Sequence, residues 1–492
     1  MNTNKSDLHV VELLARSTTT GNSCLDFSYE RLGDTGVLFL ARMKDLSHVT
    51  QLNLSWNELT SKGVEALAKC KSLSSLTTLI LDSNDIGDEG ALAIASSKNF
   101  GNLKVLTLTK NRVGDEGALA LIKSSCLTQL STLDLELNQV GRDELAKFPD
   151  GTAVSSLSHL NLRRNEIGDD TVLNWLQTGA FVPTKRLNLG WNKIKNKGAE
   201  ALAKSPMLSG LEQLILDSNS IGNEGAGAIA QSKYLESLMV LELHDNNYNQ
   251  STAKVLMDLR VRILIKSHLK GSELNLNGKQ LKNQGLKALA QSDLLSKVET
   301  LSLRNNHFDY AGLEALAQSK HLSSLKSLNL MDNAIVNKGA IILAESEVFS
   351  GLKNLNIENC SVMPAGILAL AQSSSLKNLE KIILNKNDIK DKGMQYLAAS
   401  KNFTKLKSLK AGDVSISDLA VRMLVLSQNL KNLEELHLNG NSITRDGLTI
   451  FYETPNLCAL KKIDLRRNKF LYEDCIFLSD SPRFKNLEVV RF

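Results

Sequence analysis

The residues whose type and spacing best fit a binding chemistry are two tryptophans. Trp56 and Trp191 each stand immediately before the asparagine of a recurring motif, and Tyr29 occupies the same position in an earlier copy. An exposed tryptophan beside an apolar residue is typical of a hot spot in a protein interface. We predict that these aromatic residues bind a partner, together with the apolar residue and the acid found one copy later: Ile80 and Asp82 after Trp56, and Ile215 and Asp217 after Trp191.

Charged side chains also gather in groups along the same motif. Because the side chains of a strand alternate between its two faces, these charged positions are expected to point outward. Two interpretations stay open: a solvated face whose charges compensate one another, or a patterned surface that selects its partner by charge complementarity. The groups are Asp134 and Glu136 beside Arg163 and Arg164, Asp217 beside Glu242, His244 and Asp245, and the pair Arg466 and Arg467.

Motifs for catalysis or metal binding are absent from the sequence. None of the patterns HExxH, GxSxG or CxxC occurs, nor a phosphate-binding GxxxxGK followed by Ser or Thr. Of the eight histidines, we place only His244 and His437 at outward strand positions, too far apart to cooperate. The six cysteines lack paired spacing and are expected to be reduced thiols. We therefore expect no enzyme activity, no cofactor and no metal.

The elements that must position these residues are short repeats of the form LxxLxLxxN. The motif recurs seventeen times in constant steps, as at positions 57, 84 and 111, apart from one longer step between positions 246 and 279. An asparagine at the end of each short strand offers a donor and an acceptor to buried peptide groups of neighbouring coils. Thirteen copies hold this structural asparagine: Asn57, Asn84, Asn111, Asn138, Asn165, Asn192, Asn219, Asn246, Asn306, Asn333, Asn387, Asn441 and Asn468.

Four copies have another residue at the asparagine position: Glu30, Lys279, Cys360 and Val414. Cysteine is small and weakly polar, so Cys360 is expected to fit the same buried niche. Lysine and valine cannot replace the amide equally well. We therefore predict local irregularity at Lys279 and Val414.

An alanine-rich helical pattern follows most strands, as in Gly-Ala-Leu-Ala-Ile-Ala at 90–95. Strands pair at about 4.8 Å whereas helices need about 10 Å of width, so stacked strand–helix units must curve with the strands inside. The sequence predicts an α/β horseshoe in one continuous body, with a parallel β-sheet on the concave face and helices on the convex face. We expect a capping helix within residues 1–24, over Ser6–Arg16, and a repeat domain over residues 25–492.

The pattern LxxLxLxxNxIGxxGAxALA resembles the ribonuclease-inhibitor-like class of leucine-rich repeats over essentially the whole chain. The recurrent Gly-Ala-x-Ala-x-Ala is similar to the GALA-type repeats of bacterial effectors delivered into host cells. The resemblance implies a leucine-rich repeat solenoid of seventeen repeats, each of about 27 residues. GALA effectors carry an F-box ahead of their repeats, but only about two dozen residues precede the first repeat here. A ubiquitin-ligase adaptor role is therefore not carried over.

Two departures from regularity stand out. The long repeat at 246–279 holds a short basic stretch, and Arg260 and Arg262 in it are candidate contacts for an acidic partner. Insertions in solenoids usually form loops, so a tolerated surface bulge is the alternative. Residues 52–69 and 79–95 also parallel residues 187–204 and 214–230, which lie five repeats later. Duplication of a repeat block explains this likeness without function, and two equivalent anchors are the other possibility.

The composition bounds the function. Lys and Arg number 58 against 53 Asp and Glu, without a basic run, which argues against nucleic acid binding. The N-terminus lacks the apolar core of a signal peptide, and no run of apolar residues could span a bilayer. We expect a monomer in the cytoplasm, or one delivered into a host cytosol. The final residues, LEVVRF, match the start of an eighteenth strand, so we expect a C-terminal edge that is either poorly capped or cut.

These observations favour a scaffold that binds a partner protein through the concave face and rims of the solenoid, and the resemblance to GALA-type repeats implies a bacterial effector acting in a host cell. The alternative is a GTPase regulator, because a GTPase-activating protein for a nuclear-transport GTPase uses the same repeat class. That role would need an exposed arginine or asparagine placed against the nucleotide. Such a regulator typically carries an acidic tail, which this chain lacks.

Overall fold

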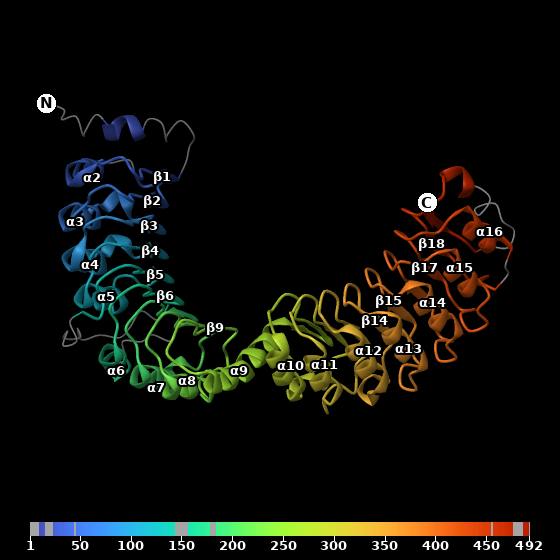
Figure 1. The fold of residues 1–492 in the computed structure, drawn as a ribbon. Helices are drawn as coiled ribbons and strands as arrows, with labels where there is room; N and C mark the ends of the chain where they lie inside the picture. Colours follow the sequence, from blue (N-terminus) through green and yellow to red (C-terminus); the bar gives the residue numbers. More distant parts are fainter. Residues whose placement is uncertain are drawn as a thin grey trace. The chain divides into compact units, whose positions relative to one another are not determined.

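The computed structural model describes residues 9–14, 23–43, 46–142, 156–177, 184–453, 456–475 and 486–491. The chain divides into two compact units, Met1–Leu256 and Met257–Phe492. Each unit is a stack of strand–helix coils, with its strands on one side and its helices on the other (Figure 1). The predicted fold class, an α/β solenoid with a parallel sheet, is confirmed.

The first unit contains a nine-stranded parallel sheet in sequence order. Each strand residue pairs with its equivalent in the next repeat, as Leu52 does with Leu79, because the repeat length is constant. The strands are β1 (Cys24–Asp26), β2 (Gln51–Asn53), β3 (Thr78–Ile80), β4 (Val105–Thr107), β5 (Thr132–Asp134), β6 (His159–Asn161), β7 (Arg186–Asn188), β8 (Gln213–Ile215) and β9 (Val240–Glu242). The helices are α2 (Gly33–Arg42), α3 (Ser61–Lys69), α4 (Gly87–Ala95), α5 (Asp115–Ile122), α6 (Asp169–Gln177), α7 (Asn196–Lys204) and α8 (Asn223–Ala230).

The second unit contains a ten-stranded sheet, which opens with an antiparallel pair and continues in parallel. The strands are β10 (Leu269–Lys270), β11 (Glu273–Asn275), β12 (Thr300–Ser302), β13 (Ser327–Asn329), β14 (Asn354–Asn356), β15 (Lys381–Ile383), β16 (Ser408–Lys410), β17 (Glu435–His437), β18 (Lys462–Asp464) and β19 (Val489–Arg491). The helices are α10 (Lys282–Ala290), α11 (Tyr310–Ala317), α12 (Val336–Glu345), α13 (Pro364–Gln372), α14 (Lys390–Ala399), α15 (Asp418–Val425) and α16 (Arg445–Glu453).

The long repeat forms a helix, so the expectation of a loop is wrong. Helix α9 (Gln250–His268) runs across the division between the units, and its buried residues include Leu256, Leu259, Val261, Ile263 and Ile265. Within the described residues, β9 pairs only with β8, and a new sheet begins at β10. The longer helix therefore interrupts the sheet that the sequence was expected to form in one piece.

The core between strands and helices is aliphatic. Most strands bury two inward apolar residues, usually leucines such as Leu79 and Leu81, and the helices add alanine and isoleucine such as Ala91 and Ile94. The predicted capping helix falls only partly within the described residues. His9–Leu14 is helical there, with Val10 buried, and the His9 ring lies 3.0 Å from the carboxylate of Glu30.

The structural asparagines join successive coils by side-chain hydrogen bonds. Asn387 is typical: its Nδ2 donates to the Ile357 carbonyl at 2.8 Å and the Leu384 carbonyl at 2.7 Å. Its Oδ1 accepts from the amides of Cys360 and Val362 at 3.1 and 2.9 Å. The amide thus pairs peptide groups that would otherwise be buried without a partner.

The exceptions to the asparagine ladder differ in their effect. Cys360 is fully buried, and its Sγ lies 3.2 Å from the Leu330 carbonyl, as expected of a small polar substitute. Burial raises the pKa of this thiol to about 12. The strand register is unbroken at Val414, so the predicted irregularity there is wrong for the sheet. The ladder does change there, since the Ile389 amide donates instead to the Asn387 carbonyl at 3.0 Å.

Two further ladders join the helices. An aspartate or asparagine in the first turn of one helix accepts from amides at the start of the next, as Asp88 does from Gly114 at 2.6 Å and Gly117 at 3.0 Å. A serine after each of several helices donates to a carbonyl ending the previous one, as Ser319 does to Ala290 at 2.6 Å. Both satisfy helix-terminal groups that have no partner within their own helix. No helix of the described ranges is long and apolar enough to cross a membrane.

Candidate partner-binding surface

A rim position recurs after the strand of each of the seventeen repeats, immediately before the ladder residue. At all seventeen such positions the backbone has a positive φ, between 52° and 68°. Only two of these residues are glycines, Gly278 and Gly440, so the coil imposes a left-handed turn on residues for which it is unfavourable. Equivalent backbone geometry makes each rim side chain leave the sheet at an equivalent point.

The first aromatic site lies at the rim over β1 and β2. Tyr29 and Trp56 stack with ring centroids 5.4 Å apart and planes inclined by 13°. Both rings are accessible, with 69% and 45% of their surface exposed. The ammonium of Lys110 lies 4.7 Å from the centroid of a Trp56 ring. A recess of about 330 Å³ opens beside them, lined by Trp56, Ser83, Asn84, Asp85, Lys110, Arg112, Leu137, Asn138 and Gln139.

The second aromatic site lies five repeats later. Trp191 is 49% exposed, and its ring faces two guanidinium groups, Arg164 at 4.9 Å and Arg163 at 5.9 Å from the centroid. Both tryptophans thus carry a cation over the ring, a favourable pairing with the negative face of the aromatic system. The cations come from different positions of the array, because Lys110 follows Trp56 by two repeats whereas Arg164 precedes Trp191 by one.

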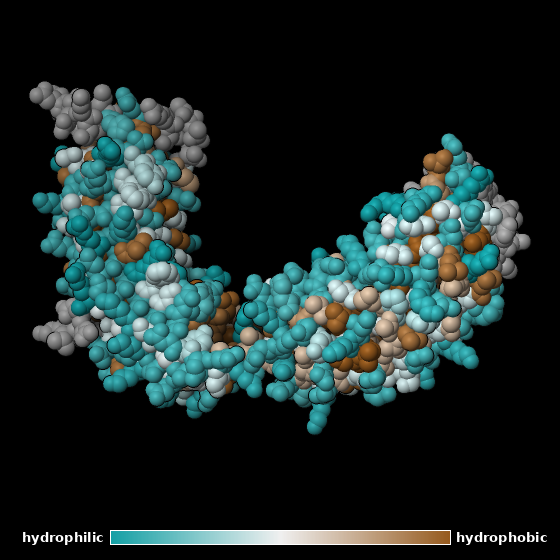
Figure 2. Space-filling view, viewed as in Figure 1, coloured by the Kyte–Doolittle hydropathy of each residue, from teal (hydrophilic) through white to brown (hydrophobic). Residues whose placement is uncertain are grey.

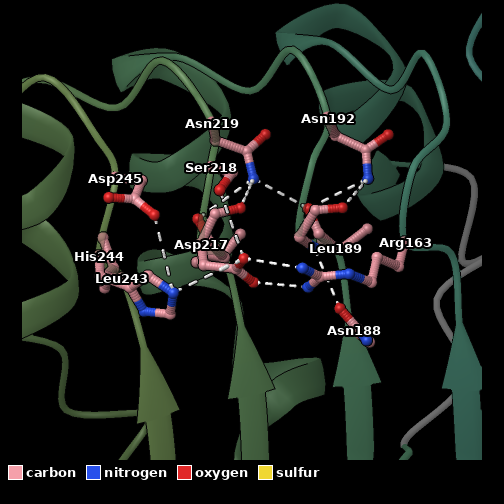
Figure 3. A network of polar contacts seen from close by, with 12 residues as sticks. Arg163, Asn188, Leu189, Asn192, Asp217, Ser218, Asn219, Leu243, His244 and Asp245 are labelled. Atoms are coloured by element: carbon pink, nitrogen blue, oxygen red, sulfur yellow. Dashed lines mark hydrogen bonds and ion pairs between the residues drawn. The ribbon is translucent and has the colours of Figure 1, made fainter.

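Arg163 is fixed by an ion pair that skips one repeat. Its Nη1 and Nη2 donate to Oδ1 and Oδ2 of Asp217 at 2.8 and 3.0 Å, across the intervening strand β7 (Figure 3). The Asp217 side chain is only 3% exposed and that of Arg163 25%. Burial opposes ionisation of Asp217, but the bonds and charge of Arg163 outweigh it and hold the pKa of Asp217 below its usual value.

The ion pair needs a glycine beneath it. A Cβ added to Gly190 would lie 2.5 Å from Arg163 Nη1 and clash with Asp217 Oδ1. The second unit repeats this device, since Arg467 reaches Asp413 at 3.1 Å across Gly440. A glycine in the middle repeat therefore leaves room for an arginine to pair with an aspartate two repeats away.

Replacing Gly190 with alanine is expected to separate Arg163 from Asp217. The two side-chain ends can move away from the new methyl group, so we expect a loss of about 1–2 kcal/mol in the free energy of unfolding, mainly from the weakened charge pair. Urea unfolding followed by circular dichroism would measure it. The same change at Gly210, where a Cβ has open space around it, is the matched control and should be nearly neutral.

The first copy of the duplicated block lacks this ion pair. Asp82 corresponds to Asp217, but Ser28 stands where Arg163 stands and Ser55 stands where Gly190 stands in the second copy. Asp82 instead accepts the Thr109 amide at 2.9 Å, and burial raises the pKa of its carboxyl group. The two tryptophan sites are therefore alike in backbone and different in charge. Ile80 and Ile215 are both half-buried on the concave face.

A second recess, of about 210 Å³, lies on the concave face over β5 to β8. Its lining includes Asp134, Arg186, Ile215 and His159. His159 was missed from the outward residues because it begins its strand, one residue before the LxL core of the motif. Burial and the neighbouring Arg186 lower the pKa of His159. This recess gives the face both signs of charge around an apolar floor.

The remaining candidates are dispersed. The His244 ring lies 3.8 Å from Asp217 and 3.9 Å from Asp245, and Glu242 is exposed beside them. Glu136 accepts from Asn161 Nδ2 at 3.3 Å. The other four belong to the second unit: Arg260 and Arg262 are exposed on α9, Arg466 pairs with Asp464 at 2.6 Å, and Arg467 pairs with Asp413.

Other exposed apolar side chains among the described residues include Met239, Met363, Leu419, Leu426 and Leu471. On the face shown in Figure 2 hydrophilic residues predominate, and apolar residues form small separate patches on each unit. Scattered apolar residues of this kind are normal on a protein surface. Among the described residues, no group of histidine, cysteine, aspartate or glutamate side chains could hold a metal ion.

Stacked strand–helix coils, joined by asparagine ladders, define a leucine-rich repeat solenoid. Comparison of the sequence with family models agrees: the model described as Leucine Rich repeat matches residues 45–68, 72–95, 102–121, 155–172, 185–203, 211–230, 295–317, 321–344, 375–398 and 429–449. The chain thus contains leucine-rich repeats in the matched residues. Among curated proteins, none matches the chain in sequence.

Several solved structures are similar to the chain. A TLR13–ssRNA13 complex shares 20% identity at a TM-score of 0.34, over 90% of this chain and 59% of the TLR13 chain. An internalin from Listeria monocytogenes shares 17% sequence identity at a TM-score of 0.24, over 93% of this chain and 82% of the internalin chain. A leucine-rich repeat protein from Leptospira interrogans shares 17% sequence identity at a TM-score of 0.32. The match covers 96% of this chain and 97% of the Leptospira chain. This chain therefore spans less than two thirds of the TLR13 chain.

Proposed function

We propose that the protein is an interaction scaffold that binds a partner protein through the concave face and rim of its first unit. One observation carries this proposal: Trp56 and Trp191 stand exposed at equivalent rim positions, each with a cation over its ring. Large aromatic side chains held rigidly contribute much of the affinity of protein interfaces. The role is binding without catalysis, and the protein acts as a monomer.

The finer class follows from the repeat pattern. We place the repeats in the ribonuclease-inhibitor-like class with GALA-type helices, on the strength of the segment Gly90–Ala95 and its counterparts. A bacterial effector acting in a host cytosol fits this pattern. A translocation reporter fused to the chain tests whether the protein is delivered into host cells. If no reporter signal appears in host cells, the effector role is contradicted.

The GTPase-regulating alternative is less well supported. Two arginines of the strand faces are held by carboxylates, Arg163 by Asp217 and Arg466 by Asp464. Such pairing favours a fixed recognition surface over an arginine presented to a nucleotide. A panel of GTPases assayed for hydrolysis with the intact chain separates the two functions, since faster hydrolysis would support the alternative.

Replacing Trp56 and Trp191 with asparagine tests the scaffold role directly. Asparagine tolerates the left-handed backbone of the rim, so the coil is preserved while the aromatic anchor is removed. We expect each single substitution to lower the affinity for a partner captured with the intact chain about tenfold. The double substitution should lower it about a hundredfold. Binding is measured by titration after affinity capture.

Trp175 provides the internal control for this experiment. It is 2% exposed in α6, and its fluorescence reports whether the first unit stays folded in the variants. Unchanged affinity in the folded double variant, or a failure of the intact chain to retain any protein, would contradict the proposed function.

A further inference from the structure

A row of six side chains runs along the rim of the first unit and links its two aromatic sites. All six precede the ladder position of consecutive repeats and share φ values from 53° to 58°. At about 4.8 Å per strand, the row is about 24 Å long. In order, its members are Trp56, Ser83, Lys110, Leu137, Arg164 and Trp191.

The two cations of the row are held in place but not neutralised. Lys110 and Arg164 lie over tryptophan rings at 4.7 and 4.9 Å, and neither has an ion-pair partner among the described residues. Their neighbours differ, since Arg112 pairs with Asp85 at 2.9 Å. A cation already fixed over a ring loses little conformational freedom on meeting an anion. The row therefore presents two preorganised positive charges.

Apolar surface separates these two charges. Leu137 lies between them and is 42% exposed, although it too has a positive φ. The recess of about 330 Å³ runs from Leu137 to Trp56, with Lys110 and Arg112 in its lining. A carboxylate entering the recess would meet the ammonium of Lys110, since Arg112 is already paired with Asp85 in the same lining, and an adjacent apolar group would cover Leu137.

We propose that the partner presents to this row a segment in the polyproline II conformation, with two acidic side chains three residues apart and an apolar residue between them. Lys110 and Arg164 are two strands apart, about 10 Å. A polyproline II chain advances about 3.1 Å per residue and returns to the same side every third residue, whereas side chains at i and i+3 of a β-strand point to opposite faces. A polyanion such as single-stranded nucleic acid fits less well, because Asp82, Asp134 and Glu136 lie on the concave face next to the row. This inference rests on the proposed function and specifies the chemistry of the partner segment that binds.

Selection from a phage-displayed library of random ten-residue peptides on the intact protein tests the inference. Enriched peptides are expected to carry Asp or Glu at positions i and i+3 with an aliphatic or aromatic residue between them. The double variant Lys110→Glu and Arg164→Glu should lose at least tenfold in affinity for these peptides and should itself select Lys or Arg. The matched control is Lys193→Glu, just beyond the row, which should bind the acidic peptides within threefold of the unaltered protein.

The outcomes distinguish the inference from the proposed function. Peptides that depend on Trp56 and Trp191 but carry no acidic pair, or bind the charge-reversed protein equally well, would overturn the inference and leave the scaffold function standing. Selection of no peptide dependent on the tryptophans counts against both. If a single-stranded RNA oligonucleotide at equal concentration displaces the acidic peptides, the inference is overturned. The ligand of the row would then be a nucleic acid.

Discussion

Replacing Asn387 with valine is expected to lower the free energy of unfolding of the second unit by about 3–4 kcal/mol. The side chain is 1% exposed, and its loss leaves the Ile357 carbonyl and the amides of Cys360 and Val362 buried without their present partner. Each unpaired buried group costs about 1–3 kcal/mol, which outweighs the apolar gain of valine. Urea unfolding and amide hydrogen exchange of β14 and β15 would measure the loss.

The reverse substitution at Val414 is the matched control. An asparagine there would offer its Oδ1 to the Ile389 amide, which now bonds to the Asn387 carbonyl. We expect Val414→Asn to stabilise the second unit by about 1 kcal/mol. If Asn387→Val costs less than about 1 kcal/mol, the ladder does not hold the coils together as described.

Replacing Arg163 with methionine is expected to cost about 2–3 kcal/mol at neutral pH. Methionine keeps the apolar stem over Trp191 but leaves the nearly buried carboxylate of Asp217 without its cation. The His244 ring, 3.8 Å from Asp217, is 60% exposed and compensates little. Adding Asp217→Asn should restore about half of the lost stability, because a neutral amide tolerates burial better than an unpaired charge.

The pH dependence of this loss has a defined sign. In the unaltered protein, the folded pKa of Asp217 lies below that of an unfolded aspartate, about 3.9. Its contribution to stability is present above that value and is lost as the pH falls through the lower folded pKa. Without Arg163, burial raises the pKa of Asp217, so the deficit of Arg163→Met should shrink below about pH 4. A deficit of equal size under strongly acidic and neutral conditions would contradict the charge-pair explanation.

The coil itself could be predicted from the sequence because one local rule repeats. The spacing of Leu79, Leu81 and Asn84 fixes what is buried and what pairs, and the constant repeat length fixes the register. The rule fails where the chain leaves it. Residues 250–268 form helix α9 although four of its buried residues, Leu259, Val261, Ile263 and Ile265, stand at alternate positions, a spacing that by itself favours a strand.

The candidate site could be predicted only in part. The rim tryptophans are visible in the sequence as repeat positions, but their left-handed backbone and the cations over their rings are not. The pair of Arg163 with Asp217 joins repeats that are not neighbours, so no local pattern predicts it. Its one sequence signal is Gly190, a glycine at an outward strand position. The helix-joining aspartates, such as Asp88, also carry a signal in their recurrence from repeat to repeat.

The most direct test of the scaffold proposal is photo-crosslinking from matched positions of the duplicated block. Ser83 and Ser218 are equivalent rim residues with φ of 56° and 53°, whereas Glu65 and Glu200 are equivalent residues of helices α3 and α7. With p-benzoylphenylalanine at each position in turn, the proposal predicts a covalent adduct with the same partner protein from both rim positions and none from the helices. Adducts from the helices, with none from the rim, would contradict it.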